Sequence, residues 1–212
     1  MKDAEILHII LAIIILAIVL GFQSIIDLNL QETGIVLLFA FNIIGANILV
    51  KKWMASYLDA GVEHETWLWS RYGLHPGGHL KKPIPIGIIL PIIFTIFSLG
   101  TIKLMTLLTY ETHALKRRAA KRHGYYSFTE MTEWHNALVG AAGIVIVLLV
   151  SFIAYWIPPI SGLSAFAAYY AFWNMIPISK LDGTQIFMGS RLLWYTLGII
   201  TLIFVGYALF LI

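Results

Sequence analysis

The sequence predicts an all-α, polytopic membrane protein with about six transmembrane helices. Of its 212 residues, 59% are hydrophobic and only 12% are charged, whereas a soluble domain is about 45–50% apolar and about 25% charged. The apolar residues also gather in runs near the length of about 20 residues that a bilayer crossing needs. This composition excludes a single soluble domain, a disordered chain and a nucleic-acid-binding protein. We therefore expect the lipid bilayer as a partner, no nucleic acid, and an integral, multi-pass location in the cytoplasmic or an equivalent cell membrane.

The predicted helices lie near residues 6–26, 34–50, 86–109, 136–157, 163–178 and 192–212. The first run is too long and too weakly flanked by basic residues to be a cleaved signal peptide. The third run contains Pro91, which kinks a helix, and Lys103, which must reach the membrane surface or face the bundle interior. Two paths are open for this run. It crosses the membrane, which we expect, or it dips in and returns around its prolines.

Basic clusters indicate the sidedness of the membrane only in part. The stretch 116–122 is the strongest positive-inside signal and predicts a cytoplasmic loop. The loop 51–83 also carries five Lys and Arg residues, with only one apolar run between the two basic loops. Three acidic residues dilute the charge of that loop, which favours a crossing by residues 86–109. The interleaved Trp, Tyr and Lys residues of 52–83 predict a segment at the membrane interface rather than a separate soluble domain.

Asp182 is the sharpest candidate for a functional residue, because charged residues within apolar runs are costly and are functional hypotheses by default. It stands at the end of the fifth run, where a mouth of the bundle is expected. Pro177 ends the preceding helix, and Gly183 lets the chain turn close to a neighbour. A carboxylate in this place can bind a metal ion, cap the following helix or pair with a cation.

The residues around Asp182 carry a recognisable pattern, Asn-x-x-Pro-x-x-x-Leu-Asp-Gly, formed by Asn174, Pro177, Leu181, Asp182 and Gly183. This pattern resembles the second signature of the site-2 proteases, a family of intramembrane zinc metalloproteases. The resemblance implies a three-helix core in which a zinc ion lies between a His-Glu-x-x-His helix and the Asp. The zinc ion there activates a water molecule that cleaves peptide bonds within the membrane.

The resemblance also implies a division of the chain. Residues 84–190 correspond to the site-2 protease-like core. Residues 1–83 are an accessory transmembrane hairpin followed by the interfacial segment, and residues 191–212 form a C-terminal transmembrane helix. No linker in the sequence is long enough to separate independent domains.

Thr109–Leu115 is the best candidate for the zinc-binding helix of the family, since small and basic residues follow it. In this alignment Thr109 stands at the first zinc-binding His, Tyr110 at the catalytic Glu, and His113 at the second His. A Thr hydroxyl replaces imidazole poorly, and Tyr is a proton donor rather than a base at neutral pH. We therefore expect His113 and Asp182 as the possible metal ligands, no confident catalytic residue and no cofactor.

Three classes of function remain open. The favoured one is a site-2 protease-like protein without peptidase activity, whose core groove binds a transmembrane client protein. The second is a working zinc protease with a relocated ligand set, in which Glu111 or Glu133 serves as the base and the ligands are His113, His135 and Asp182. The third is a small channel or transporter that uses charged residues as a pathway, although the sequence lacks the repeat symmetry of many transporters.

Overall fold

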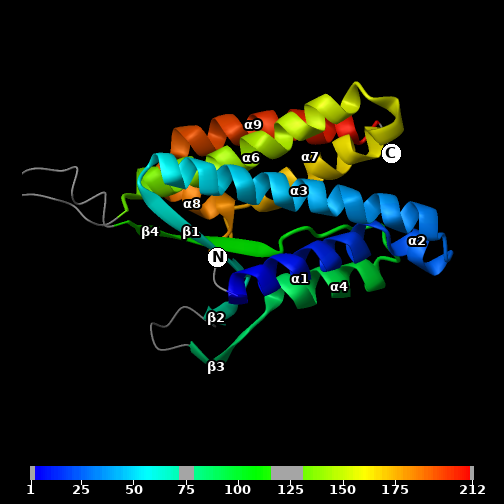
Figure 1. Ribbon diagram of the computed structural model, residues 1–212, viewed down its shortest axis with the longest axis horizontal. Helices are drawn as coiled ribbons and strands as arrows, with labels where there is room; N and C mark the ends of the chain where they lie inside the picture. Colours follow the sequence, from blue (N-terminus) through cyan, green and yellow to red (C-terminus); the bar gives the residue numbers. More distant parts are fainter. Residues whose placement is uncertain (1–2, 72–78, 116–130, 211–212) are drawn as a thin grey trace, which may run out of the picture.

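The computed structural model describes residues 3–71, 79–115 and 131–210, and it is mostly helical. Figure 1 shows long helices lying side by side in a bundle. Within these described residues, three helices are long and apolar enough to cross a membrane, namely α3, α6 and α9, so a membrane protein is indicated. The helices are α1 (Asp3–Leu20), α2 (Phe22–Ile26), α3 (Leu30–Tyr57), α4 (Ile86–Phe97), α6 (Glu133–Tyr155), α7 (Ser161–Met175), α8 (Asp182–Gly189) and α9 (Arg191–Ala208), with a 3-10 turn η1 (Pro158–Ile160) before α7.

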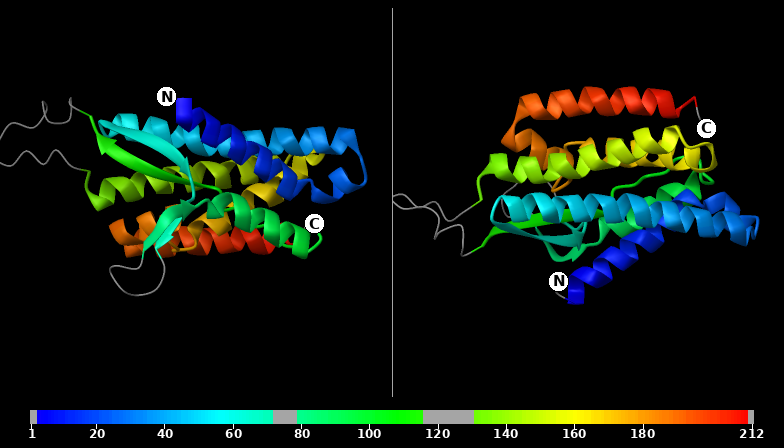
Figure 2. Two further views of the ribbon diagram at one scale, coloured as in Figure 1. Left: turned by 90° about the horizontal axis from the view of Figure 1, so that it is seen from below. Right: turned by 45° about the horizontal axis from the view of Figure 1, so that its top comes forward.

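Close packing in the bundle depends on small residues at the helix contacts. Helix α6 lies against α3, α7 and α8, and α7 lies against α9 (Figure 2). On α6, a side chain at Gly140 would meet Tyr110 and one at Gly143 would meet Lys51, so both positions need glycine for the helix to approach its neighbours. Small residues at such contacts are typical of helices that associate within a membrane. The buried core between α1, α3 and α6 contains Leu16, Ile43, Ile44, Ile144 and Val147.

The all-α prediction misses the four short strands that the described residues form at one end of the bundle. They are β1 (Ala60–Thr66), β2 (Trp69–Arg71), β3 (His79–Ile84) and β4 (Leu108–Ala114). Strand β1 pairs antiparallel with β4, and β2 pairs antiparallel with β3, which gives two separate two-stranded sheets. The segment that we predicted to lie at the interface therefore supplies three of these strands. Tertiary pairing with β4, far along the chain, gives β1 its structure.

The predicted crossing by residues 86–109 is wrong, because this run enters the bundle and returns. Helix α4 has only 12 residues, about 18 Å at 1.5 Å per residue, which is short of the roughly 30 Å of a hydrocarbon core. The chain turns after it, with Leu99 at φ 53° and Gly100 at φ 82°. At the other end, Trp67 accepts a hydrogen bond from the Gly87 N–H and donates its own N–H to the Leu107 carbonyl. The two ends of the run thus meet at one residue.

This return path removes the conflict in the basic loops. Both ends of the run lie beside Trp67, so the residues before α4 and those of β4 lie at the same end of the bundle (Figure 1). The described basic residues of the loop 51–83 and the end of β4 then lie on one side, so the positive-inside rule is no longer violated by this run. The stretch 116–122 itself lies outside the described residues.

Candidate functional site

The Asn174–Gly183 stretch forms a tight bend between α7 and α8. Helix α7 ends at Met175, and Ser179 takes a left-handed conformation at φ 57°. A Cβ atom on Gly183 would lie 2.1 Å from the Met175 carbonyl oxygen, so only glycine fits there. Asn174 donates its amide to the carbonyl oxygens of Tyr170 at 2.9 Å and Met105 at 3.3 Å, which ties α7 to the segment returning from α4. The pattern residues therefore fix the position of α8.

Asp182 pairs with a buried cation, which is one of the three roles that the sequence allowed. The Lys51 ammonium nitrogen lies 2.6 Å from Asp182 Oδ2, and their side chains are only 4% and 1% exposed. Leu181, not Asp182, is the N-cap residue of α8, and no side chain caps this helix. Asp182 is thus held by an ion pair between α3 and α8, a contact that links residues 131 positions apart.

Asn47 belongs to the same buried cluster. It stands four residues before Lys51 on α3, so the two side chains lie on one face of the helix. Both reach the same glycine of α6, since a Cβ atom on Gly143 would lie 2.5 Å from Lys51 Cε and 2.9 Å from Asn47 Nδ2. Within the described part of the chain, Asn47 Nδ2 and Asp182 Oδ1 are buried without a hydrogen-bond partner. Neither α3 residue is predicted as a site residue from the sequence, although an Asn and a Lys one turn apart at the end of an apolar run are a usable signal.

The predicted helix over Thr109–Leu115 is wrong, because these residues form strand β4. Thr109, Tyr110 and Thr112 favour extended structure, and the strand pairs with β1 along its whole length. Side chains alternate between the two faces of a strand, so Thr109 and His113 point away from the face that Tyr110 occupies. The His113 ring lies over Gly61 of β1, where a Cβ atom would be 2.3 Å from its Nε2.

Tyr110 is the residue of this strand that approaches the ion pair. Its ring centroid lies 4.6 Å from the Lys51 ammonium nitrogen. Burial raises the pKa of the Tyr110 phenol well above its ordinary value, and the negative charge of Asp182 raises it further. The phenol therefore stays protonated and donates a hydrogen bond of 2.8 Å to the Asn136 carbonyl. In this position it acts as a donor that fixes β4 on α6.

The relocated ligand set is not assembled. Among the residues that the structure describes, no three His, Asp or Glu side chains come together to hold a metal ion. His135 lies in the first turn of α6, where its ring and its backbone N–H both contact the Thr132 hydroxyl that caps the helix. Asp182 faces Lys51, and His113 faces Gly61. The three residues proposed for this set have different surroundings.

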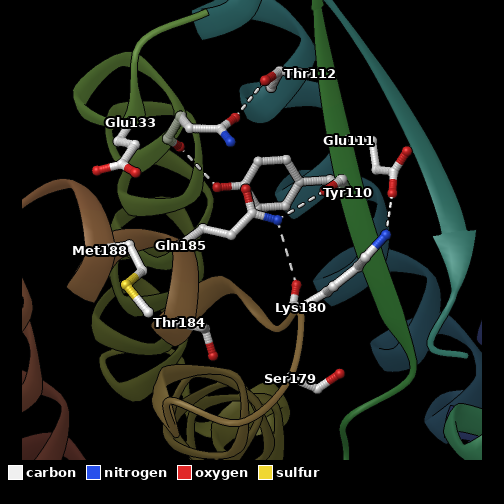
Figure 3. Close-up of a pocket in the computed structure, with 10 residues that line it drawn as sticks. Tyr110, Glu111, Thr112, Glu133, Ser179, Lys180, Thr184, Gln185 and Met188 are labelled. Atoms are coloured by element: carbon white, nitrogen blue, oxygen red, sulfur yellow. Dashed lines mark hydrogen bonds and ion pairs between the residues drawn. The ribbon is translucent and has the colours of Figure 1, made fainter. Parts of the chain in front are cut away.

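An open groove lies beside Tyr110, and we call it the β4 groove. It has a volume of about 380 Å³. Its walls are the edge of β4, the first turn of α6 and the segment from Ser179 to Met188 (Figure 3). Glu111 pairs with Lys180 across one end of it, and the Thr112 hydroxyl bonds to the Asn136 amide at the other. The lining residues are Tyr110, Glu111, Thr112, Glu133, Asn136, Ser179, Lys180, Thr184, Gln185 and Met188.

On the side that faces this groove, β4 has no strand partner among the residues that the structure describes. In the β1–β4 register, Trp67 donates to the Leu107 carbonyl and Leu115 donates to the Asp59 carbonyl. Antiparallel pairs alternate between bonded and non-bonded positions, so the odd-numbered residues of β4 bond to β1. The N–H and C=O groups of the even-numbered residues, Tyr110 and Thr112 among them, therefore point away from β1.

Gln185 of α8 already meets this free edge. Its side-chain amide donates a hydrogen bond of 2.8 Å to the Tyr110 carbonyl, as an adjoining strand would (Figure 3). Among the described residues, Gln185 Oε1 and Thr184 Oγ1 are buried polar atoms with no hydrogen-bond partner. The groove thus combines a free strand edge with an acceptor and a hydroxyl that have no partner. This arrangement is suited to an extended peptide.

A second buried polar cluster joins α1, β1 and the end of α3. Glu5 of α1 bonds to Lys52 at 2.7 Å, and His64 of β1 donates both its backbone N–H and its ring Nδ1–H to Glu5 Oε1 at 3.3 Å. Burial lowers the pKa of His64 to about 3, and the positive charge of Lys51 contributes to this shift. His64 is therefore neutral at physiological pH. The cluster fastens α1 and β1 to α3.

Comparisons with known proteins identify no relative of this chain. No protein-family model matches the chain, no curated protein matches it, and no solved structure matches it. The assignment of a function therefore depends on the geometry of the ion pair and the groove.

Proposed function

We propose that this chain is a site-2 protease-like membrane protein that has no peptidase activity and binds a segment of a membrane client in the β4 groove. The observation that carries the proposal is the buried Lys51–Asp182 ion pair. In the family, the Asp of this motif is a zinc ligand. Here its carboxylate faces an ammonium group, which has three donors and no lone pair to offer a metal.

We further infer that α3, rather than residues 109–115, corresponds to the zinc-binding helix of the family. Asn47 and Lys51 stand four residues apart and lie on the face of α3 that meets α6 and α8. The sequence Asn47-Ile48-x-x-Lys51 then occupies the place of His-Glu-x-x-His. Neither position supplies an imidazole, and Ile48 cannot act as a general base. A cation of the chain itself balances the charge of Asp182 in place of zinc.

The alignment is tested by rebuilding the metal site. The triple variant Asn47→His/Ile48→Glu/Lys51→His places two imidazoles and a carboxylate beside Asp182, which suits zinc. We expect about one zinc ion per purified, dialysed chain by atomic emission, and its loss on adding Asp182→Asn. The matched control is Thr109→His/Tyr110→Glu, which introduces the same residue types on β4 and should bind no zinc. Zinc in this control and none in a folded triple variant would overturn the alignment.

Client binding is the second half of the proposal and rests on the free edge of β4. An extended peptide can add a strand to such an edge through main-chain hydrogen bonds, while pockets beside it select side chains. Glu111 and Lys180 pair with each other at one end of the groove, so their charges balance, and Glu133 adds a single acidic group to the lining. We therefore expect a client segment of low charge.

A photo-crosslinker at Met188, which lines the groove and is 64% exposed, tests this. The probe is a synthetic extended peptide of alternating Val and Thr in the same membrane preparation. Thr112→Pro removes an N–H on the free edge and should lower the crosslinking yield about tenfold, whereas Thr112→Val keeps the N–H and should not. A crosslinker at Leu202 of α9 is the control for non-specific contact. Equal yields at Met188 for Thr112→Pro and Thr112→Val would exclude strand addition.

A further inference from the structure

A separate cavity of about 320 Å³ lies between the returning segment and the helices α7 and α9. Its walls include Thr101 and Lys103 of the returning segment, Tyr169 and Trp173 of α7, and Val205 of α9. The aromatic rings come from the outward face of α7, where they are partly exposed. The cavity does not share a lining residue with the β4 groove.

Lys103 gives this cavity a charge that no described carboxylate balances. Its side chain is partly buried, and within the residues that the structure describes no ion pair or hydrogen bond involves its ammonium group. Its nitrogen lies 4.8 Å from the centroid of the Phe166 ring. A ring contributes only about 0.5–2 kcal/mol to holding a cation, much less than a paired anion does in an apolar environment. The site therefore has positive charge to offer.

The position of Lys103 along the bundle indicates which anion can reach it. Phe166 is five residues into α7, about 7.5 Å along the helix from its start at 1.5 Å per residue, and the Lys103 nitrogen lies beside its ring. The same end of the bundle holds a cluster of aromatic residues, in which Tyr155 lies 5.6 Å from Trp156 and 4.5 Å from Tyr207 between ring centroids. Tyr and Trp gather at the level of lipid headgroups.

The Lys103 ammonium nitrogen lies beside the Phe166 ring, so a lipid phosphate that enters about 7.5 Å below the helix end meets it. The end in question carries α2 and the α6–α7 connection, opposite the β1–β4 sheet (Figure 1). The cavity thus has a cation near the headgroup level and an aromatic wall directed along the bundle. A molecule with an anionic head and an apolar chain complements both parts.

We propose that this cavity binds an anionic phospholipid. The phosphate oxygens of the lipid pair with the Lys103 ammonium, and an acyl chain lies against Tyr169 and Trp173. Charge selects the lipid, because a zwitterionic headgroup brings its own cation to the phosphate. The bound lipid fills the space between the returning segment and α7, so it stabilises the return of the chain from α4.

Native mass spectrometry of the full chain in detergent tests the proposal. The protein is titrated separately with dioctanoyl-phosphatidylglycerol, dioctanoyl-phosphatidylcholine and inorganic phosphate. We expect a one-to-one complex with phosphatidylglycerol, at least about fivefold less with phosphatidylcholine, and none with phosphate alone. Lys103→Met keeps the apolar stem and should reduce phosphatidylglycerol retention by about fivefold or more, while Lys103→Arg should keep it.

Lys82→Met is the matched control, since Lys82 is exposed on β3, outside this cavity. It should leave lipid retention unchanged. Equal retention by Lys103→Met and the unaltered chain would overturn the site, and so would equal retention of the two lipids. Retention of inorganic phosphate alone would show that the cavity binds a free anion and would overturn the lipid proposal. If Lys103→Met unfolds, competition between the two lipids on the unaltered chain still decides the charge selection.

Discussion

The Lys51 ammonium and the Asp182 carboxylate lie 2.6 Å apart and buried, although the two residues are 131 positions apart in the chain. Each of the two groups compensates the charge of the other, because either group alone would be a buried ion without a counter-charge. Asn47 and Tyr110 complete its surroundings. The effects of substituting Lys51 and Asp182 on stability therefore distinguish a structural ion pair from a metal site.

We predict that removing one partner costs more than removing both. Lys51→Met leaves Asp182 as an unpaired buried carboxylate and should lower the free energy of unfolding by about 3–5 kcal/mol. Asp182→Asn should have a similar cost. The double variant Lys51→Met/Asp182→Asn should be more stable than either single variant, as measured by denaturant titration in detergent. Additive losses would show that the two groups do not interact.

We predict that Gly183→Ala destabilises the bend between α7 and α8. The added methyl group would lie 2.1 Å from the Met175 carbonyl oxygen and 2.3 Å from its carbonyl carbon, so the backbone must shift. Overpacking of this kind costs about 1–3 kcal/mol or more. Gly198→Ala on α9 is the control, because nothing lies within 4 Å of its added methyl group. A thermal scan should show a lower melting temperature for Gly183→Ala only.

We predict that His64 makes the stability of the chain fall in acid. Its pKa falls from an ordinary 6.5 in the unfolded chain to about 3 in the folded one, so the unfolded state binds the proton first as the pH falls. This contribution to stability is complete above pH 6.5 and is lost progressively down to about pH 3.

The slope from this one group approaches about 1.4 kcal/mol per pH unit within that window. Glu5, Lys51 and Lys52 act on the same ring, so the comparison needs a variant that changes the ring alone. His64→Gln should flatten the pH dependence of unfolding between pH 4 and 6. An unchanged slope in this variant would assign the acid sensitivity to other groups.

We predict that residues 82 and 111 lie on the same side of the membrane. The run between them returns to Trp67 rather than crossing. The chain has no native cysteine, so single cysteines can be labelled with a membrane-impermeant maleimide. Lys82→Cys and Glu111→Cys should react from one side, and Trp156→Cys, at the opposite end of the bundle and 69% exposed, from the other. Labelling of positions 82 and 111 from opposite sides would show that the run between them crosses the membrane.

The sequence predicts the helices of the bundle better than the residues of the candidate site. Helices α3, α6 and α9 lie within or around predicted runs, since a long apolar segment has few ways to satisfy its backbone in a membrane. The stretch from Asn174 to Gly183 was found because each residue has a local role, such as the glycine that lets α8 approach Met175. The strand at 108–114 was missed, because its structure comes from pairing with β1, 42 or more residues earlier.

By itself, the sequence determined that this is a membrane protein built of apolar helices, with a sharp bend before Asp182. Composition, run length and the positions of Pro177 and Gly183 suffice for that, because they act over a few residues. The tertiary structure alone decided that residues 86–109 return, that Tyr110 lies on a strand, and that Lys51 faces Asp182. These three relations join segments that are far apart in the chain, so they depend on how whole helices and strands pack and pair with one another.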